Sequence, residues 1–190
     1  MSAFLGPIHY RMFRKALAVD SLARDIAAYA DGESWTDGLA AALDAEHPRL
    51  QGEIADHIDL SSIHASLNAL VGNSESALAA ATAPLSGHMA DLAAHVREVG
   101  ASAGKQAEFG TLQQAWNALD ESWLDGMPCD GFVKFGDNDD STVSWSVNLD
   151  AHKALGYAQI RAAWLEGFCQ GAGLDFSSPE AGSYRISKAA

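Results

Sequence analysis

The hydrophobic pattern of this chain changes its period once, close to residue 130, and this change limits what the chain can fold into. Before that point, apolar residues recur at the spacing of one face of a helix. After it, Thr142–Val147 alternates polar and apolar side chains, which is typical of a half-buried strand. We therefore predict an α+β fold that is mostly α: an antiparallel helical bundle over residues 1–128, and a small α+β cap over 129–190. The cap is expected to pack on the bundle as one structural unit.

Proline and capping residues divide the first part of the chain into predicted helices. These helices cover residues 7–31, 36–57, 61–99 and 111–126, and Pro7, Thr36, Ser61, Ser62 and Thr111 are suited to their starts. Pro48 interrupts the second helix. The third would be about 58 Å long if it were straight, at 1.5 Å per residue, so we expect a break. Gly72–Asn73 and Pro84 are the candidates for that break.

Turn-forming residues also define the cap. Residues 132–135 and 142–147 are predicted to form a hairpin through the turn at 136–140. Asp150 is predicted to cap a last helix, and residues 184–187 can return as a third strand.

The charge of the chain limits its partners. There are 25 Asp and Glu against 12 Lys and Arg, which gives a net charge of −13. Such a charge repels phosphate backbones and anionic lipids, so we expect no nucleic acid and no membrane among the partners. The sequence has no apolar run of the roughly 20 residues that a membrane span needs, and no signal-peptide pattern at its start. We therefore predict a cytoplasmic protein in which Cys129 and Cys169 are free thiols.

Two histidines are candidates for a functional site because each falls in the first turn of a predicted helix. The helix dipole disfavours a charged imidazole at His9 and His64, which leaves a lone pair for a metal or a proton. If the 61–99 run keeps one direction, the up-down topology brings both helix starts and Cys129 to one end of the bundle. Asp59, Asp125 and Asp130 are nearby carboxylates in this arrangement.

Two chemistries could use these residues, and a structural role is the alternative to both. His9, His64, Cys129, Asp59 and Asp130 make a ligand set for zinc or iron, with a position left open for a small molecule. Alternatively, Cys129 is a catalytic nucleophile whose thiolate is generated by a histidine. In the structural alternative, the histidines only cap and pack, and Cys129 is a small buried residue.

Three short segments resemble a family of uncharacterised proteins from anaerobic bacteria. The segments are Phe4–Tyr10, Ile58–His64 and Asp125–Asp130, in this order, and the resemblance spans most of the chain. The resemblance implies that His9, His64 and Cys129 form one group of residues that recurs in the family. It implies no particular substrate or reaction.

The family carries an aromatic residue soon after its first histidine and a bulky residue shortly after its second. Tyr10 matches the first feature, whereas Ala65 departs from the second, so the surroundings of His64 are expected to differ.

We conclude from the sequence that the protein binds a metal or small ligand at one end of a helical bundle, and that the question of enzyme activity stays open. The alternative is a non-catalytic interaction or homodimerisation module in which the same residues are structural. Trp116, Trp123 and Trp145 would then serve the core or an interface.

Overall fold

The computed structural model describes residues 4–125 and 131–189, and its chain divides into two compact units. Unit 1 comprises residues 4–86 with the short pieces 121–124 and 153–155. Unit 2 comprises the other described residues from 87 onward. The fold class is α+β and mostly α, as the sequence predicts. Within the described residues, no helix combines the length and the apolar character that crossing a membrane requires.

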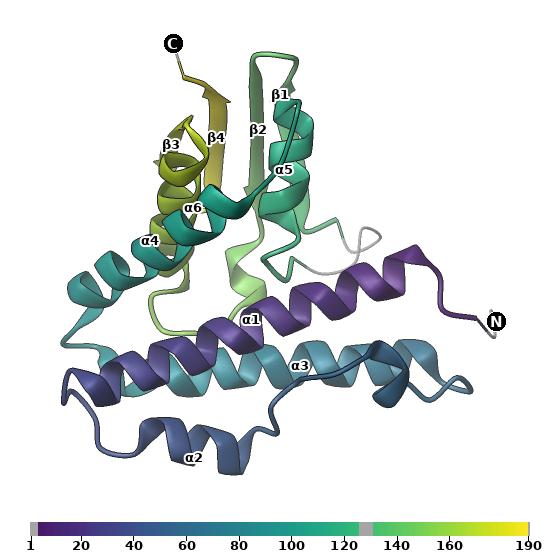
Figure 1. The fold of residues 1–190 in the computed structure, drawn as a ribbon, viewed down its shortest axis with the longest axis vertical. Helices are drawn as coiled ribbons and strands as arrows, with labels where there is room; N and C mark the ends of the chain where they lie inside the picture. The colour runs from purple at the N-terminus through teal and green to yellow at the C-terminus, as the bar shows by residue number, and fades with distance from the viewer. Residues whose placement is uncertain (1–3, 126–130, 190) are drawn as a thin grey trace. The chain divides into compact units, whose positions relative to one another are not determined.

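Unit 1 is built on two long helices, α1 (Pro7–Gly32) and α3 (Ile63–Thr82), which lie side by side and begin at the same end (Figure 1). The short α2 (Leu39–Glu46) and the 3-10 turn η1 (Ile54–Asp56) lie on the segment that returns the chain from the end of α1 to the start of α3. The turn η2 (Ala83–Leu85) follows α3. The two helices are therefore parallel, which agrees with the prediction that the helix starts carrying His9 and His64 share one end.

The second predicted helix is much shorter than expected, and its cap is a different residue. Pro48 disfavours helical backbone at the residue before it, and α2 ends at Glu46. Asp31, at the end of α1, caps α2: its carboxylate accepts hydrogen bonds from Leu39 N at 3.0 Å and Ala40 N at 2.9 Å. Thr36, the predicted cap, donates to the same carboxylate at 2.8 Å. The bond from Ala40, with that from Thr36, lowers the pKa of Asp31.

The long third run breaks at Pro84 and not at Gly72–Asn73. The helix α3 continues through Gly72 and Asn73 without interruption, and Pro84 lies in η2, where a missing N–H is tolerated. The next helix, α4 (Met89–Gln106), belongs to unit 2. The single helical run predicted over residues 61–99 is thus two helices, α3 in unit 1 and α4 in unit 2.

Unit 2 combines helices with a four-stranded antiparallel sheet of order β1-β2-β4-β3. The elements that follow α4 are α5 (Leu112–Asp120), β1 (Val133–Asn138), β2 (Thr142–Val147), η4 (Leu149–Ala151), α6 (Tyr157–Ala172), β3 (Leu174–Glu180) and β4 (Ser183–Lys188). The predicted hairpin is confirmed as β1 and β2, and the predicted third strand is confirmed as β4, which pairs with β2.

Three features of unit 2 differ from the sequence prediction. The strand β3 was not predicted, because most of its side chains are exposed and give little apolar pattern. The last helix begins after Gly156, whose φ of +65° is the left-handed value that glycine favours, so Asp150 does not cap it. The helix α5 ends at Asp120 rather than at residue 126.

Glycines hold α4 and α6 at backbone contact. Gly100 and Gly104 on α4 face α6, and Gly167 and Gly171 on α6 face α4. A Cβ atom added at any of these glycines would lie 2.8–3.0 Å from a carbonyl carbon of the other helix, deep inside van der Waals contact. This contact ties α4 to the C-terminal helix and the sheet, so the two units do not follow the predicted boundary between residues 128 and 129.

The glycine contact predicts opposite effects for two Gly-to-Ala variants. Gly167→Ala should lower the free energy of unfolding by about 3 kcal/mol, because the methyl group would collide with the α4 backbone. Gly72→Ala in α3 is the matched control: no atom lies within 4 Å of the added methyl group, so it should stabilise by up to about 1 kcal/mol. Urea unfolding followed by circular dichroism measures both. Equal effects of the two variants would contradict the proposed contact.

Candidate functional site

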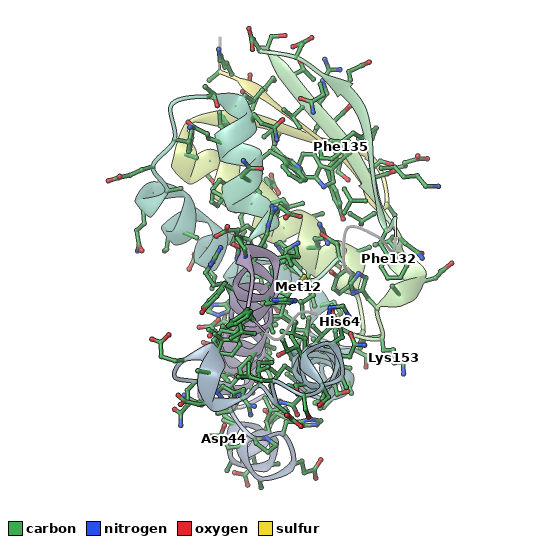
Figure 2. All side chains as sticks on the ribbon, turned by 90° about the vertical axis from the view of Figure 1, so that its right-hand side faces the viewer. Met12, Asp44, His64, Phe132, Phe135 and Lys153 are labelled. Atoms are coloured by element: carbon green, nitrogen blue, oxygen red, sulfur yellow. The ribbon has the colours of Figure 1, made fainter. Side chains whose placement is uncertain are left out.

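The structure brings His9 and His64 together at the end of unit 1 where α1 and α3 begin. Their ring centroids are 5.8 Å apart and the rings are tilted by 55°. His9 is only 7% exposed, whereas His64, the second residue of α3, is exposed to solvent. Figure 2 looks onto this end of the two helices, and His64 is labelled there. The outer ring, His64, is therefore accessible from solvent, whereas the ring of His9 is largely enclosed.

One ring nitrogen of His9 is already used by the start of α1. The N–H of Gly6, which precedes the helix, donates a hydrogen bond to His9 Nδ1 at 2.8 Å. This is the bond that the third residue of a capping box makes. Because Nδ1 accepts this hydrogen bond with its lone pair, the proton of the neutral ring is on Nε2. Within the described part of the chain, His9 Nε2 makes no hydrogen bond.

Asp59, one of the predicted ligands, is occupied by the turn that leads into α3. Its carboxylate accepts hydrogen bonds from Ser61 Oγ at 2.7 Å, Ser61 N at 2.8 Å and Ser62 Oγ at 3.1 Å. The Ser61 hydroxyl, with the two other donors, lowers the pKa of Asp59. The carboxylate therefore holds this turn in place.

The described residues fit the predicted metal centre only in part. A metal on His9 Nε2 would require the proton to move to Nδ1, which would break the bond from Gly6. No group of three or more His, Cys, Asp or Glu side chains in the described ranges is arranged to hold a metal ion. Cys129 and Asp130 lie outside the described residues. Zinc or iron bound by the full set of five residues therefore stays a prediction.

A second polar cluster lies inside unit 2 and centres on Arg161 of α6. Both of its terminal nitrogens bind the carboxylate of Asp125, with Nη2 to Oδ2 at 2.8 Å and Nη1 to Oδ1. Nη1 also donates to the Tyr157 hydroxyl at 3.1 Å. Both charged side chains are 2% exposed. Burial alone would lower the pKa of Arg161, but the attraction of Asp125 and the nearby tyrosines raises it above its ordinary value.

His152 completes this cluster without joining the first site. Its ring stacks on Tyr157 with a centroid distance of 3.8 Å, and its Nε2 lies 3.9 Å from Asp125 Oδ1. Asp125, predicted as a carboxylate near the histidine site, is thus the counter-ion of a buried arginine. Sequence reasoning missed Arg161, although its position at helical spacing from Trp164, Leu165 and Phe168 could have revealed an arginine within an apolar stripe.

The three tryptophans that the interaction hypothesis invoked are all buried. Trp116, Trp123 and Trp145 are 9%, 1% and 5% exposed. The rings of Trp116 and Trp145 lie 6.4 Å apart inside unit 2, and Trp116 also contacts Phe135 of the sheet. Their role in the structure is core packing.

No protein-family model, curated protein or solved structure matches this chain. Its function is therefore inferred from its own residues.

The buried Arg161–Asp125 pair predicts a large loss of folding stability when one partner is removed. Asp125→Ala should lower the free energy of unfolding by about 3–5 kcal/mol, because it leaves the Arg161 charge buried without its counter-ion. Glu121→Ala is the matched control, since the Arg14–Glu121 pair is about half exposed and its loss should cost at most about 1 kcal/mol. Urea unfolding of both variants tests this difference. A cost for Asp125→Ala no greater than the control would contradict the assigned role of the pair.

The two cysteines are predicted to differ in reactivity. Cys169 is fully buried, and burial raises the pKa of its thiol to about 12, so only about one molecule in ten thousand carries a thiolate at pH 8. Timed alkylation of the folded protein with mass spectrometry should leave Cys169 unlabelled until denaturant is added. The sequence predicts faster labelling of Cys129. Labelling of Cys169 ahead of Cys129 in the folded protein would contradict both the burial and a thiolate role for Cys129.

Proposed function

We propose that this protein binds a small molecule or ion at the end of unit 1 where α1 and α3 begin, with His9 and His64 as its contact residues. The observation that carries the proposal is the 5.8 Å approach of these two rings, which come from residues far apart in the sequence. Among the described residues, only Nδ1 of His9 takes part in a hydrogen bond, and His64 is exposed to solvent.

Buried contacts of α1 hold the segment that returns the chain from α1 to α3. Asp20 of α1 accepts hydrogen bonds from Arg24 Nη2 at 3.0 Å and from Leu50 N at 3.2 Å. Arg24 Nη2 also donates to the carbonyl of His47 at 2.6 Å. These buried contacts fix the return segment against α1. The start of α3 lies beside the start of α1 because the two helices pack directly on each other.

The second candidate function is that of a non-catalytic interaction or homodimerisation module. Phe4, Tyr10 and Leu60 are 80%, 43% and 57% exposed; Phe4 and Leu60 precede α1 and α3, and Tyr10 lies near the start of α1. Aromatic and aliphatic side chains exposed in this way are typical of the centre of a protein interface. Light scattering over a range of protein concentrations tests for the homodimer.

The proposed site predicts that two histidine variants lose binding while they remain folded. His9→Ala removes a helix cap, so it should cost about 1 kcal/mol of stability, and His64→Ala should cost less because its side chain is exposed. Zinc chloride, sodium phosphate and sodium hexanoate, each titrated separately into the full chain, serve as probes. Nuclear magnetic resonance of the histidine rings should show at least one probe shifting both His9 and His64 in the wild type.

Each alanine variant should lose that response. His47→Ala, on the same unit but outside the pair, is the control that should keep it. If none of the three probes shifts the two rings, or if both variants bind like the wild type, the proposed site is wrong.

A further inference from the structure

We propose that unit 2 has a binding site of its own, an open cleft of about 490 Å³ that takes a basic amino acid as its ligand. This site is separate from the His9–His64 pair and does not rest on the proposed function. The cleft lies where the end of β4 comes beside the β1–β2 turn and the start of α5 (Figure 1). Its volume falls within the range of about 300–1,000 Å³ that is typical of small-molecule sites.

The lining of the cleft is mainly polar, which favours a polar ligand. Six polar residues contribute to it: Thr111, Gln113, Asn138, Asp139, Asp140 and Lys188. The apolar side chain in the lining, Leu112, is 3% exposed, so it forms little of the accessible wall. A ligand of this cleft therefore gains more from charge and hydrogen bonding than from apolar contact.

The charges of the lining indicate which polar ligand fits. Lys188 is positive, and Asp139 and Asp140 are negative. Within the described part of the chain, the side chains of Lys188 and Asp140 make no hydrogen bond or ion pair, and Asp139 uses only Oδ1. A ligand with two cationic groups and one carboxylate would place an opposite charge beside each of these three residues. L-Lysine and other basic amino acids carry those groups.

The β1–β2 turn keeps Asp139 in its charged form. Its Oδ1 accepts hydrogen bonds from Ser141 Oγ at 2.6 Å, Ser141 N at 2.7 Å and Thr142 N at 2.9 Å. The Ser141 hydroxyl, with the two backbone donors, lowers the pKa of Asp139. The carboxylate is therefore negative at neutral pH, and its Oδ2 can accept from an ammonium group of the ligand.

The walls of the cleft are held by hydrogen bonds of their own. At the start of α5, Gln114 Oε1 accepts from Gly110 N at 2.8 Å and Thr111 N at 3.1 Å, and Gln114 N donates to Thr111 Oγ1 at 3.2 Å. Asp139 N donates to Thr142 O at 2.8 Å and closes the turn opposite. Because both walls are already fixed, binding costs little ordering of the chain.

Lys188 favours an amino acid over a metal ion as the ligand. Its ammonium group repels a metal cation but attracts the carboxylate of an amino acid. In the ranges that the structure describes, no three His, Cys, Asp or Glu side chains are arranged to hold a metal. The net charge of −13 also raises the local concentration of a ligand that is positive overall, as a basic amino acid is.

The ligand test titrates L-lysine, L-norleucine, cadaverine and calcium chloride separately into the full chain, at neutral pH and constant low ionic strength. Norleucine lacks the side-chain ammonium of lysine, and cadaverine lacks its carboxylate. The backbone amides of residues 138–141 are followed by nuclear magnetic resonance. L-Lysine should shift them at millimolar concentration. It should bind about threefold to fivefold more tightly than norleucine or cadaverine, because each of these loses one exposed ion pair.

Two variants separate the two ends of the ligand. Lys188→Gln should weaken L-lysine binding by about threefold to fivefold and leave cadaverine binding unweakened, because cadaverine has no carboxylate to lose. Asp140→Asn should weaken the binding of both. Lys153→Gln, at an exposed lysine outside the cleft, is the control that should bind like the wild type. The substituted side chains are exposed, so the variants should remain folded.

The remaining outcomes contradict the proposal. It is wrong if L-lysine shifts none of these amides, or if norleucine or cadaverine binds as tightly as L-lysine. It is also wrong if Lys188→Gln keeps the full preference for L-lysine over cadaverine. Shifts caused by calcium chloride and not by L-lysine would make the ligand a metal cation. His64→Ala should leave L-lysine binding unchanged, so a failure here is distinct from a failure of the His9–His64 site.

Discussion

The backbone contact between α4 and α6 is the constraint on which the second unit depends. Gly100 and Gly104 on one helix meet Gly167 and Gly171 on the other, and a Cβ at any of them would collide with main chain. The spacing of four residues places each pair on one helix face, so the two helices touch along a line rather than at a point. The same helix α6 carries Arg161, which binds Asp125, and leads directly into the strand β3.

Each unit also encloses a carboxylate–guanidinium pair, and the two pairs serve different segments. In unit 1, Asp20 and Arg24 bind backbone atoms of His47 and Leu50, which fixes an extended stretch that has no helix or strand bonds of its own. In unit 2, Arg161 holds Asp125, which ends the described part of the chain before residue 131. A buried ion pair contributes little net stability, but its geometry specifies which irregular segment can lie against the helix.

The sequence predicted much of the fold and part of the candidate site. The hairpin and the strand β4 were predictable because their side chains alternate and glycine and aspartate mark the turn. The shared end of His9 and His64 was also predictable from the two helix starts, and the structure has them in contact. Asp31 as the cap of α2 was not predictable, because it comes from the preceding helix and its fit depends on the turn between them. The pairing of Asp125 with Arg161, residues 36 positions apart, was hidden for the same reason.

The sequence by itself determined the local structure: the helical period, the break at Pro84, the hairpin, and the presence of a histidine near the start of each long helix of unit 1. These features follow from the preferences of residues that are neighbours in the chain. Only the tertiary structure decided that α4 packs with α6, that Asp125 pairs with Arg161, and that the rings of His9 and His64 come into contact. Those outcomes depend on contacts between distant segments, and a pattern read along one segment contains no information about the surface that another segment brings to it.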